Sequence, residues 1–208
     1  MTRPVVILGG GGHARVVIDA LRCAGHRIAG VIDPKPEVTQ ALPAGVTWLG
    51  KDLSQARADE VQLAIGVGSL DANPDNPRLR LFAEAKSGGF EILTFRHPRA
   101  TVADDVEIGE GAQVMAGAIL QPGVRIGVNC IVNTGASLDH DCRIGDHVHI
   151  APGAVLSGTV DVGTGCHLGT GAVVIQNVRI GDWAMIAAGA IVTEDVPPGA
   201  RVGPGPQR

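Results

Sequence analysis

The stretch from Ile126 to Ile150 reads IGVNCIVNTGASLDHDCRIGDHVHI, and every sixth residue in it is a branched aliphatic residue. The same frame begins at Val102 and ends at Val192, and all sixteen of its positions hold Val, Ile or Leu. The residue four places after each of them is Ala, Val or Cys. An α-helix repeats about every 3.6 residues and a strand about every 2, so neither explains a six-residue period.

A triangular solenoid of parallel strands explains this period, because each of its three faces uses one short repeat. Three faces make a coil of eighteen residues, and glycine recurs at that interval, at Gly109, Gly127, Gly145, Gly163 and Gly181. Five coils stacked about 4.8 Å apart would form a prism roughly 24 Å tall. Aliphatic stacks fill such a prism, which agrees with an aromatic content of only 2%. We therefore predict a parallel β-helix of about five coils over residues 96–208.

Residues 1–95 follow a different pattern, in which short apolar runs alternate with helical segments. Strands are expected over residues 5–10, 27–33 and 61–69, and helices over residues 13–25 and 77–89. The first helix should bury Val16, Val17, Ala20 and Leu21, which share helical spacing. A strand, a glycine turn, a helix and a strand in this order predict a Rossmann-like α/β domain with a parallel sheet.

Composition excludes several classes of protein. The formal net charge is −4 and Lys and Arg are dispersed, so no surface for nucleic acid or an anionic membrane is expected. No apolar run approaches the roughly 20 residues that span a bilayer. No apolar leader precedes the first expected strand, and we expect a cytoplasmic protein. Cys130, Cys142 and Cys166 occupy the small position of the repeat, where we expect inert packing thiols rather than disulfides or a metal cluster.

The whole chain resembles the NeuD/PglD family of sugar N- and O-acyltransferases. The resemblance rests on GGGGHARVVIDAL near the start, HPRATVADDVEIGEGA where the repeats begin, NTGASLDHDCRIGDHVHIAPGAVLSG at their centre and DVPPGARVGPGP at the end. The spacing of Asn133, His140 and His149 is typical of that family. The resemblance implies a left-handed β-helix, acetyl-CoA as the acetyl donor and a nucleotide-activated amino sugar as the acceptor. It also implies a homotrimer with active sites between subunits.

His140 and Asp141 have two interpretations. They are either charged residues on the surface of the solenoid or a catalytic pair. The equivalent positions one coil away include Gly123 and Gly158, and such small neighbours would leave the histidine accessible. Acetyl transfer to an amine requires a base that takes the amine proton, and histidine titrates near neutral pH. The resemblance implies that His140 is this base and that Asp141 orients its ring, as an acid does in serine proteases. Asp139 has no role in this hypothesis.

His149 and His167 lie one coil apart, and two stacked histidines are compatible with a metal pair. No acidic residue and no third histidine falls in the same column, so we predict no metal site. The resemblance implies instead that His149, Thr170 and Ala188 contact acetyl-CoA. His147 has no role in the family, and we expect it to be exposed.

The glycines from Gly9 to Gly12 precede Asp33 by about twenty residues and approximate a dinucleotide-binding pattern. A plain strand-to-helix turn would have the same sequence, and an NAD-dependent enzyme would need a second catalytic domain that a solenoid does not supply. Phosphate binds well to the free N–H groups of a helix N-terminus. Pro34 stands where the family often has a second acid, so the nucleotide stays open. The resemblance implies a nucleotide-sugar site made by Gly10, Gly11, Gly12, His13, Asp33, Ile65 and Gly66.

The leading hypothesis is N-acetylation of the 4-amino group of a nucleotide-linked 4-amino-4,6-dideoxyhexose, either GDP-perosamine or a UDP-amino sugar, for surface glycan synthesis. O-acetylation of a sugar such as sialic acid makes the same demand for a base and is the alternative within the fold. A non-catalytic solenoid with an assembly role is a third alternative. The joint presence of Asn133, His140 and Asp141 argues against it.

Overall fold

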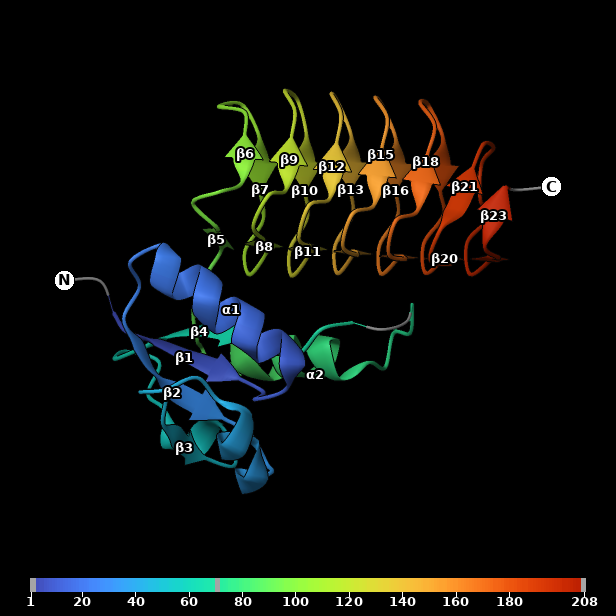
Figure 1. Cartoon of the computed structure of the whole chain (residues 1–208). Coiled ribbons are helices and arrows are strands. Elements are labelled where there is room, and N and C mark those ends of the chain that lie inside the picture. The colour runs from blue at the N-terminus through green and yellow to red at the C-terminus, as the bar shows by residue number, and fades with distance from the viewer. Residues whose placement is uncertain (1–2, 70–71, 207–208) are drawn as a thin grey trace.

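The computed structural model describes residues 3–69 and 72–206 and shows an N-terminal sheet domain beside a solenoid (Figure 1). The N-terminal sheet is parallel, with four strands in the order β3-β2-β1-β4. Its elements are β1 (Val5–Leu8), α1 (Gly12–Cys23), β2 (Ile28–Ile32), β3 (Trp48–Gly50), β4 (Gln62–Ile65) and α2 (Pro77–Ser87), with 3-10 helices at Pro36–Ala41 and Leu53–Gln55. The predicted Rossmann-like α/β domain is confirmed.

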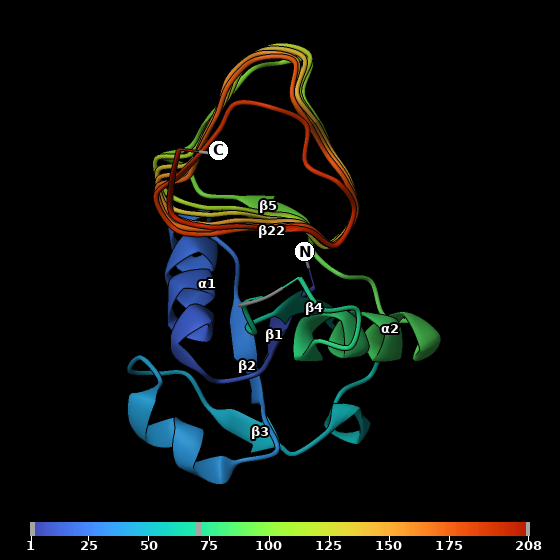
Figure 2. The same ribbon diagram turned by 90° about the vertical axis from the view of Figure 1, so that its right-hand side faces the viewer.

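The two faces of this sheet carry separate apolar clusters, because successive residues of a strand point to opposite faces. Ile7 of β1 packs in one cluster with Val17 of α1. Leu8, the next residue, packs in the other cluster with Ala85 of α2. The two helices therefore cover opposite faces of the sheet (Figure 2).

Parts of this domain differ from the sequence-based expectation. Val16 was expected in the core but is 41% exposed, because the buried stripe of α1 includes Val17, Ile18 and Leu21 and leaves Val16 on the solvent side. The strand expected over residues 61–69 ends at Ile65. Strand β3 was not expected, since its three residues are too few to show a strand period.

The solenoid consists of three parallel sheets that meet at three corners (Figure 2). The first sheet, which faces the N-terminal domain, contains β5 (Phe95–Arg96), β8 (Gln113–Val114), β11 (Ile131–Val132), β14 (His149–Ile150), β17 (His167–Leu168), β20 (Met185–Ile186) and β22 (Arg201–Val202). The second sheet contains β6 (Thr101–Val102), β9 (Ile119–Leu120), β12 (Ser137–Leu138), β15 (Val155–Leu156), β18 (Val173–Val174), β21 (Ala190–Val192) and β23 (Gly205–Pro206). The third sheet contains β7 (Glu107–Ile108), β10 (Arg125–Ile126), β13 (Arg143–Ile144), β16 (Asp161–Val162) and β19 (Arg179–Ile180).

Each strand of the solenoid pairs with the strand one coil later, so that Ile126 lies opposite Ile144. The aliphatic residues of the repeat thereby stack into one continuous core. Cys130, Cys142 and Cys166 lie buried in this core as free thiols, as the sequence predicted. Burial raises the pKa of the Cys130 thiol to about 12. The predicted left-handed β-helix is confirmed, and its third sheet has the expected five strands.

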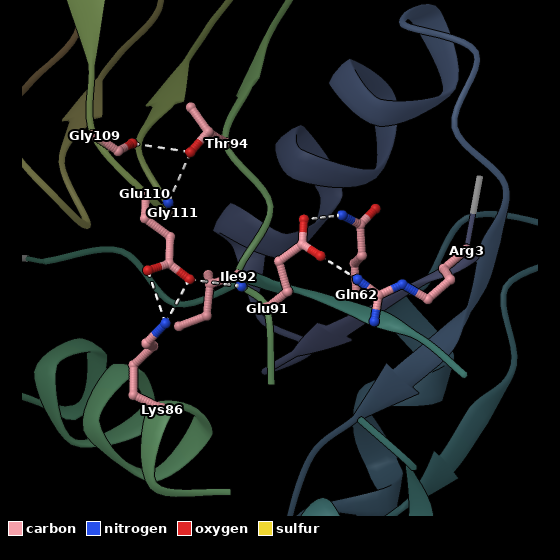
Figure 3. A network of polar contacts seen from close by, with 9 residues as sticks. All are labelled: Arg3, Gln62, Lys86, Glu91, Ile92, Thr94, Gly109, Glu110 and Gly111. Atoms are coloured by element: carbon pink, nitrogen blue, oxygen red, sulfur yellow. Dashed lines mark hydrogen bonds and ion pairs between the residues drawn. The ribbon is translucent and has the colours of Figure 1, made fainter. Parts of the chain in front are cut away.

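Polar contacts join the first sheet of the solenoid to the N-terminal domain (Figure 3). Lys86 of α2 places Nζ 2.8 Å from Oε1 of Glu110, and Thr94 donates a hydrogen bond of 2.9 Å to the carbonyl of Gly109. The predicted domain boundary between residues 95 and 96 falls inside β5. Within residues 3–69 and 72–206, neither helix has the length and apolar character that crossing a membrane would require.

Candidate active site

His140 and Asp141 form the corner between β12 of the second sheet and β13 of the third sheet. The Nδ1 atom of His140 lies 2.9 Å from Oδ2 of Asp141, and the two side chains are 58% and 63% exposed. Asp141 has a φ of 59°, in the left-handed region that glycine occupies at many corners of the solenoid. Aspartate is one of the few other residues that adopt this conformation at low cost. The corner therefore holds a carboxylate at a position where most side chains would be strained.

Glycine on the neighbouring coils makes room for this pair. A Cβ atom on Gly158 would lie only 2.6 Å from Cε1 of His140, and a Cβ atom on Gly123 would lie 2.5 Å from Oδ1 of Asp141. The imidazole therefore lies directly against Gly158, and the carboxylate lies against Gly123. The expectation that small neighbours leave the histidine accessible is confirmed.

The surroundings of His140 make it a suitable base. Its hydrogen bond with Asp141, together with the charges of Asp139 and Asp141, raises the pKa of the imidazole above its ordinary value. Asp139, which had no role in the sequence-based hypothesis, also accepts a 2.8 Å hydrogen bond from the backbone N–H of His140. Because a carboxylate only accepts, Nδ1 carries the proton and Nε2 of the neutral ring is the acceptor. Such a ring can take a proton at Nε2 while the carboxylate stabilises the imidazolium.

A groove of about 790 Å³ runs beside this corner over the third sheet. Its strand residues carry both signs of charge, at Glu107, Arg125, Arg143, Asp161 and Arg179. These residues are spaced eighteen apart, and Arg125 and Glu107 form an ion pair of 3.6 Å. Sequence reasoning did not single out this charged column, although its period was visible in the sequence.

His149 lies on a different side of the solenoid, in the first sheet, and is buried. Its Nδ1 atom is 2.5 Å from the carbonyl oxygen of Ser69, and the Asn133 amide nitrogen is 3.1 Å from Nε2. A carbonyl only accepts, so Nδ1 donates and Nε2 accepts from Asn133. Burial lowers the pKa of His149 to about 3, and the ring is therefore neutral. It meets His167 edge to face, with ring centroids 5.0 Å apart.

Thr170 and Ala188 are exposed at the corner between the first and second sheets. They stack on consecutive coils, since the backbone N–H of Gly189 donates to the carbonyl of Thr170 at 2.9 Å. Asn133 accepts a 2.8 Å hydrogen bond from the backbone N–H of Thr134, which belongs to the same corner. His149 therefore reaches this corner through Asn133 rather than by direct exposure.

The expectation for His147 is wrong, because its ring is half-buried. The side chain accepts a 3.0 Å hydrogen bond from Asn129 and packs edge to face against Phe82 of α2, with ring centroids 5.5 Å apart. His147 lies at the corner between the third and first sheets, and α2 covers this corner. The six-residue repeat alone could not show this contact.

Among residues 3–69 and 72–206, the one grouping of three metal-ligating side chains joins Asp19, Cys23 and His97. His97 accepts a hydrogen bond at Nδ1 from the backbone N–H of Arg99 at 3.0 Å. The neutral ring therefore carries its proton at Nε2, where a metal would have to bind. This arrangement does not favour a metal ion.

A pocket of about 750 Å³ lies at the carboxyl ends of the N-terminal strands, between the glycine loop and α2. Gly11 and Asp33, two of the residues that the resemblance implies for a nucleotide-sugar site, line it. Gly11 caps α1 without a side-chain hydrogen bond, so backbone N–H groups of the first turn are available to an anion. Three cations that sequence reasoning missed also line the pocket: Lys35, Lys51 and Arg80.

The other predicted substrate residues do not line this pocket. Gly10 is buried and donates a 2.7 Å hydrogen bond to Asp33, whereas Gly12 has open space around its Cα. Ile65 is fully buried, and Gly66 is packed so closely against Gly9 and Ala14 that a Cβ atom would not fit. His13 points toward the solenoid and meets Gln113, with 2.9 Å between Nε2 and Oε1.

A single chain does not bring the base and the nucleotide pocket together. The first sheet faces the N-terminal domain, and the corner that holds His140 lies on the opposite side of the prism (Figure 2). The contacts described for His140 are to residues of the solenoid.

Comparison with known proteins supports the assignment of both domains. The PglD N-terminal domain matches residues 4–73, and the bacterial transferase hexapeptide (six repeats) matches residues 123–158. UDP-N-acetylbacillosamine N-acetyltransferase of Bacillus subtilis (strain 168) is 37% identical over 115 residues, which are 54% of this chain and 51% of that protein. The matched part thus spans about half the length of this curated relative.

Two groups of solved structures resemble the chain over nearly its whole length. PerB from Caulobacter crescentus, in complex with CoA and GDP-perosamine, is 39% identical, with a TM-score of 0.86 over 95% of this chain and 92% of that one. The acetyltransferase domain of PglB from Neisseria gonorrhoeae, in complex with acetyl coenzyme A, is 33% identical, with a TM-score of 0.85 over 97% and 96% of the two chains. The chain therefore belongs to the NeuD/PglD family of acetyl-CoA-dependent sugar acetyltransferases.

Proposed function

We propose that the protein transfers the acetyl group of acetyl-CoA to the 4-amino group of a nucleotide-linked 4-amino-4,6-dideoxyhexose, either GDP-perosamine or a UDP-amino sugar. The observation that carries the proposal is the exposed His140–Asp141 pair, with 2.9 Å between Nδ1 and Oδ2. A separate pocket of about 750 Å³, lined by Lys35, Lys51 and Arg80 as well as by Asp33, Asp52 and Glu84, opens at the glycine loop, whose free N–H groups support a phosphate-bearing acceptor. The relatives that bind GDP-perosamine or are named for a UDP-sugar point to the same class of acceptor.

The reaction is a direct transfer. Nε2 of His140 takes a proton from the amine as its nitrogen attacks the thioester carbonyl. The new C–N bond forms, the C–S bond breaks, and CoA leaves as the thiolate, which takes up the proton. Asp141 stabilises the imidazolium that exists in between. Cys142 does not act as a nucleophile, because its thiol is buried and burial raises its pKa.

We infer that the acetyl donor lies along the corner between the first and second sheets. Thr170 and Ala188 are exposed there and would form one wall of the CoA site. His149 supports the same wall from inside, through Asn133 and Thr134. We assign nucleotide-sugar binding to the residues in and around the nucleotide pocket: Gly10, Gly11, Gly12, His13, Asp33, Ile65 and Gly66.

A homotrimer would complete the site. The large exposed apolar side chains of the solenoid lie on the second sheet and are between 36% and 40% exposed: Ile119, Val155, Val173 and Ile191. A second copy that covers this face would remove the apolar column from water. Closed threefold symmetry would then place the His140 corner of one subunit beside a neighbour, so that base, CoA corner and nucleotide pocket come from more than one chain.

O-acetylation and a non-catalytic role are the two alternatives to this function. O-acetylation of a sugar such as sialic acid is the second candidate, because a hydroxyl nucleophile needs the same base; the N-acetyltransferase relatives favour the amine. A non-catalytic solenoid is disfavoured by the oriented His140–Asp141 pair. The acetylated nucleotide sugar would serve surface-glycan synthesis in the cytoplasm.

A substrate panel tests the proposal. UDP-, GDP- and dTDP-linked 4-amino sugars and their 4-hydroxy counterparts are each incubated with acetyl-CoA, and thiol release is followed. We expect turnover with one or more amino sugars and none with the matching hydroxy sugars. Turnover with hydroxy sugars alone would establish O-acetylation, and no acetyl transfer to any nucleotide sugar would refute the proposed function.

A further inference from the structure

Gln113 bridges the two domains from inside the molecule. Its side chain lies on β8 in the first sheet of the solenoid and is only 1% exposed. The amide nitrogen Nε2 donates a 2.8 Å hydrogen bond to the carbonyl oxygen of Ile65, at the end of β4. The amide oxygen Oε1 lies 2.9 Å from Nε2 of His13, directly after the glycine loop.

This bridge determines which nitrogen of His13 carries the proton. The Ile65 carbonyl can only accept, so the amide nitrogen of Gln113 must face it. The amide oxygen then faces His13, and the ring nitrogen opposite that oxygen must donate. Flipping the amide would set two oxygens against each other inside the protein. The neutral His13 ring is therefore protonated at Nε2, and its Nδ1 atom is an acceptor.

The Nδ1 atom of His13 is not bonded to Gln113. Among residues 3–69 and 72–206, no hydrogen-bond partner of Nδ1 is found. His13 does not itself line the nucleotide pocket, but its ring lies beside Gly68, whose neighbour Val67 lines that pocket together with Gly11. An unprotonated nitrogen repels phosphate oxygens and attracts O–H and N–H groups. His13 is thus suited to the sugar end of a nucleotide sugar rather than to its phosphates.

The charged groups around His13 keep it neutral. Burial, followed by the nearby Arg78 guanidinium, lowers the pKa of His13 to about 4, against a smaller opposite effect of Gln113. Arg78 is itself buried on α2 and donates to the carbonyls of Val67 and Asn129. The other titratable neighbour is His149, which is neutral and bonded to Ser69. No carboxylate appears among the groups that shift the pKa of His13, and the hydrogen bond with Gln113 is too weak to offset burial and Arg78.

We propose that Gln113 is a positioning residue, which holds His13 in the tautomer whose Nδ1 accepts a hydrogen bond from a hydroxyl or amine of the bound sugar. The proposal rests on the proposed function for the presence of a nucleotide sugar. In addition, one buried amide of the solenoid determines which ring nitrogen of His13 accepts a hydrogen bond from the substrate. Specificity in the N-terminal domain thus depends on a residue of the solenoid.

The main test is Gln113→Met, which keeps the length of the side chain and removes both hydrogen bonds. Two-bond ¹⁵N–¹H correlation spectra of the His13 ring should show the Nε2–H tautomer in the wild type and a mixture of tautomers in the variant. The calorimetric Kd and the KM for the nucleotide sugar should rise about 2- to 10-fold, the effect of one neutral hydrogen bond. The KM for acetyl-CoA should stay unchanged, because neither Gln113 nor His13 lies at the corner assigned to acetyl-CoA.

Gln113→Glu keeps the proposal testable where Gln113→Met does not fold. A protonated carboxyl can donate to Ile65 and accept from His13, whereas an ionised one leaves two acceptors facing each other. Affinity for the nucleotide sugar should be normal at low pH and fall as the introduced carboxyl ionises. Lys86→Met is the matched control, since it removes the Lys86–Glu110 contact between the same two domains and should change neither the tautomer nor the Kd.

The ligand is assigned by comparing three probes on each protein: the amino sugar, its 4-hydroxy counterpart and the nucleoside diphosphate alone. A Gln113→Met effect confined to the amino sugar identifies the amine as the donor, and an equal effect on both sugars identifies a hydroxyl. An equal effect on the nucleoside diphosphate overturns the assignment to the sugar. A wild-type protein that binds none of the probes refutes the proposed function. Unchanged tautomer and Kd in both Gln113 variants of a binding protein refute the role of Gln113.

Discussion

Gly158→Ala should disable His140 without replacing it. The new methyl carbon would lie 2.6 Å from Cε1 and 3.0 Å from Cδ2 of the imidazole. Non-bonded carbon atoms are usually about 3.5 Å or more apart, so the ring must move by about 1 Å. Gly158 does not have a left-handed φ, and alanine therefore fits its backbone. The exposed imidazole can rotate aside, so the strain is relieved at His140 and not in the core.

The expected cost follows from that displacement. Misplacing a catalytic group by about 1 Å can slow a reaction about 10²-fold. This is the lower end of the roughly 10²- to 10⁴-fold contribution of a general base. The thermal unfolding temperature should hardly change, because the His140 side chain is 58% exposed. A large loss of kcat without a loss of stability is therefore the signature of this substitution.

The assay is thiol release at saturating concentrations of both substrates, with differential scanning calorimetry on the same samples. Gly203→Ala is the matched control, since a Cβ atom there would meet nothing within 4 Å. In a His140→Ala background, Gly158→Ala should cost little more, because both changes remove the same base. A Gly158→Ala enzyme with nearly normal kcat, or an equal loss in both backgrounds, would show that Gly158 does not act through His140.

Four further predictions concern the base, its carboxylate partner, the acetyl donor and the assembly. His140→Ala should lower kcat about 10²- to 10⁴-fold while calorimetry still shows acetyl-CoA binding; nearly normal turnover would return the pair to a surface role. Asp141 raises the His140 pKa and the base acts in its neutral form, so activity falls as pH drops through that pKa. Asp141→Asn should therefore move the acidic limb of the pH–rate profile to lower pH and cost less kcat than His140→Ala, whereas an unmoved limb would contradict the pairing. Ala188→Trp should raise the KM for acetyl-CoA more than the KM for the nucleotide sugar, and equal changes would count against the CoA corner. Val173→Glu combined with Ile191→Glu should convert a trimer of about 64 kDa, three times 21.3 kDa, into monomers in light scattering; a fully active wild-type monomer would disprove the assembly.

Much of the solenoid could be predicted because each residue of the repeat has the same environment one coil later. Ile126 stacks on Ile144, and Cys130 and Cys142 lie in the core at the position where small residues recur. The open setting of His140 followed from the same register, which placed Gly158 beside it. In the N-terminal domain the period is shorter and the signal weaker. Val16 was therefore assigned to the wrong side of its helix.

The solenoid, the parallel sheet before it and the adjacency of His140 and Asp141 depend on spacing along the chain, and the residues alone therefore predict them. The way in which the two domains meet depends on contacts between segments far apart in the chain, and only the folded structure shows it. His13 and Gln113 are separated by 100 residues, and His149 and Ser69 by 80, with no period to connect them. Their hydrogen bonds exist because the first sheet of the solenoid lies against the N-terminal domain (Figure 2). Domain packing therefore determines which ring nitrogen of His13 and of His149 carries the proton, and no local pattern in the sequence carries that information.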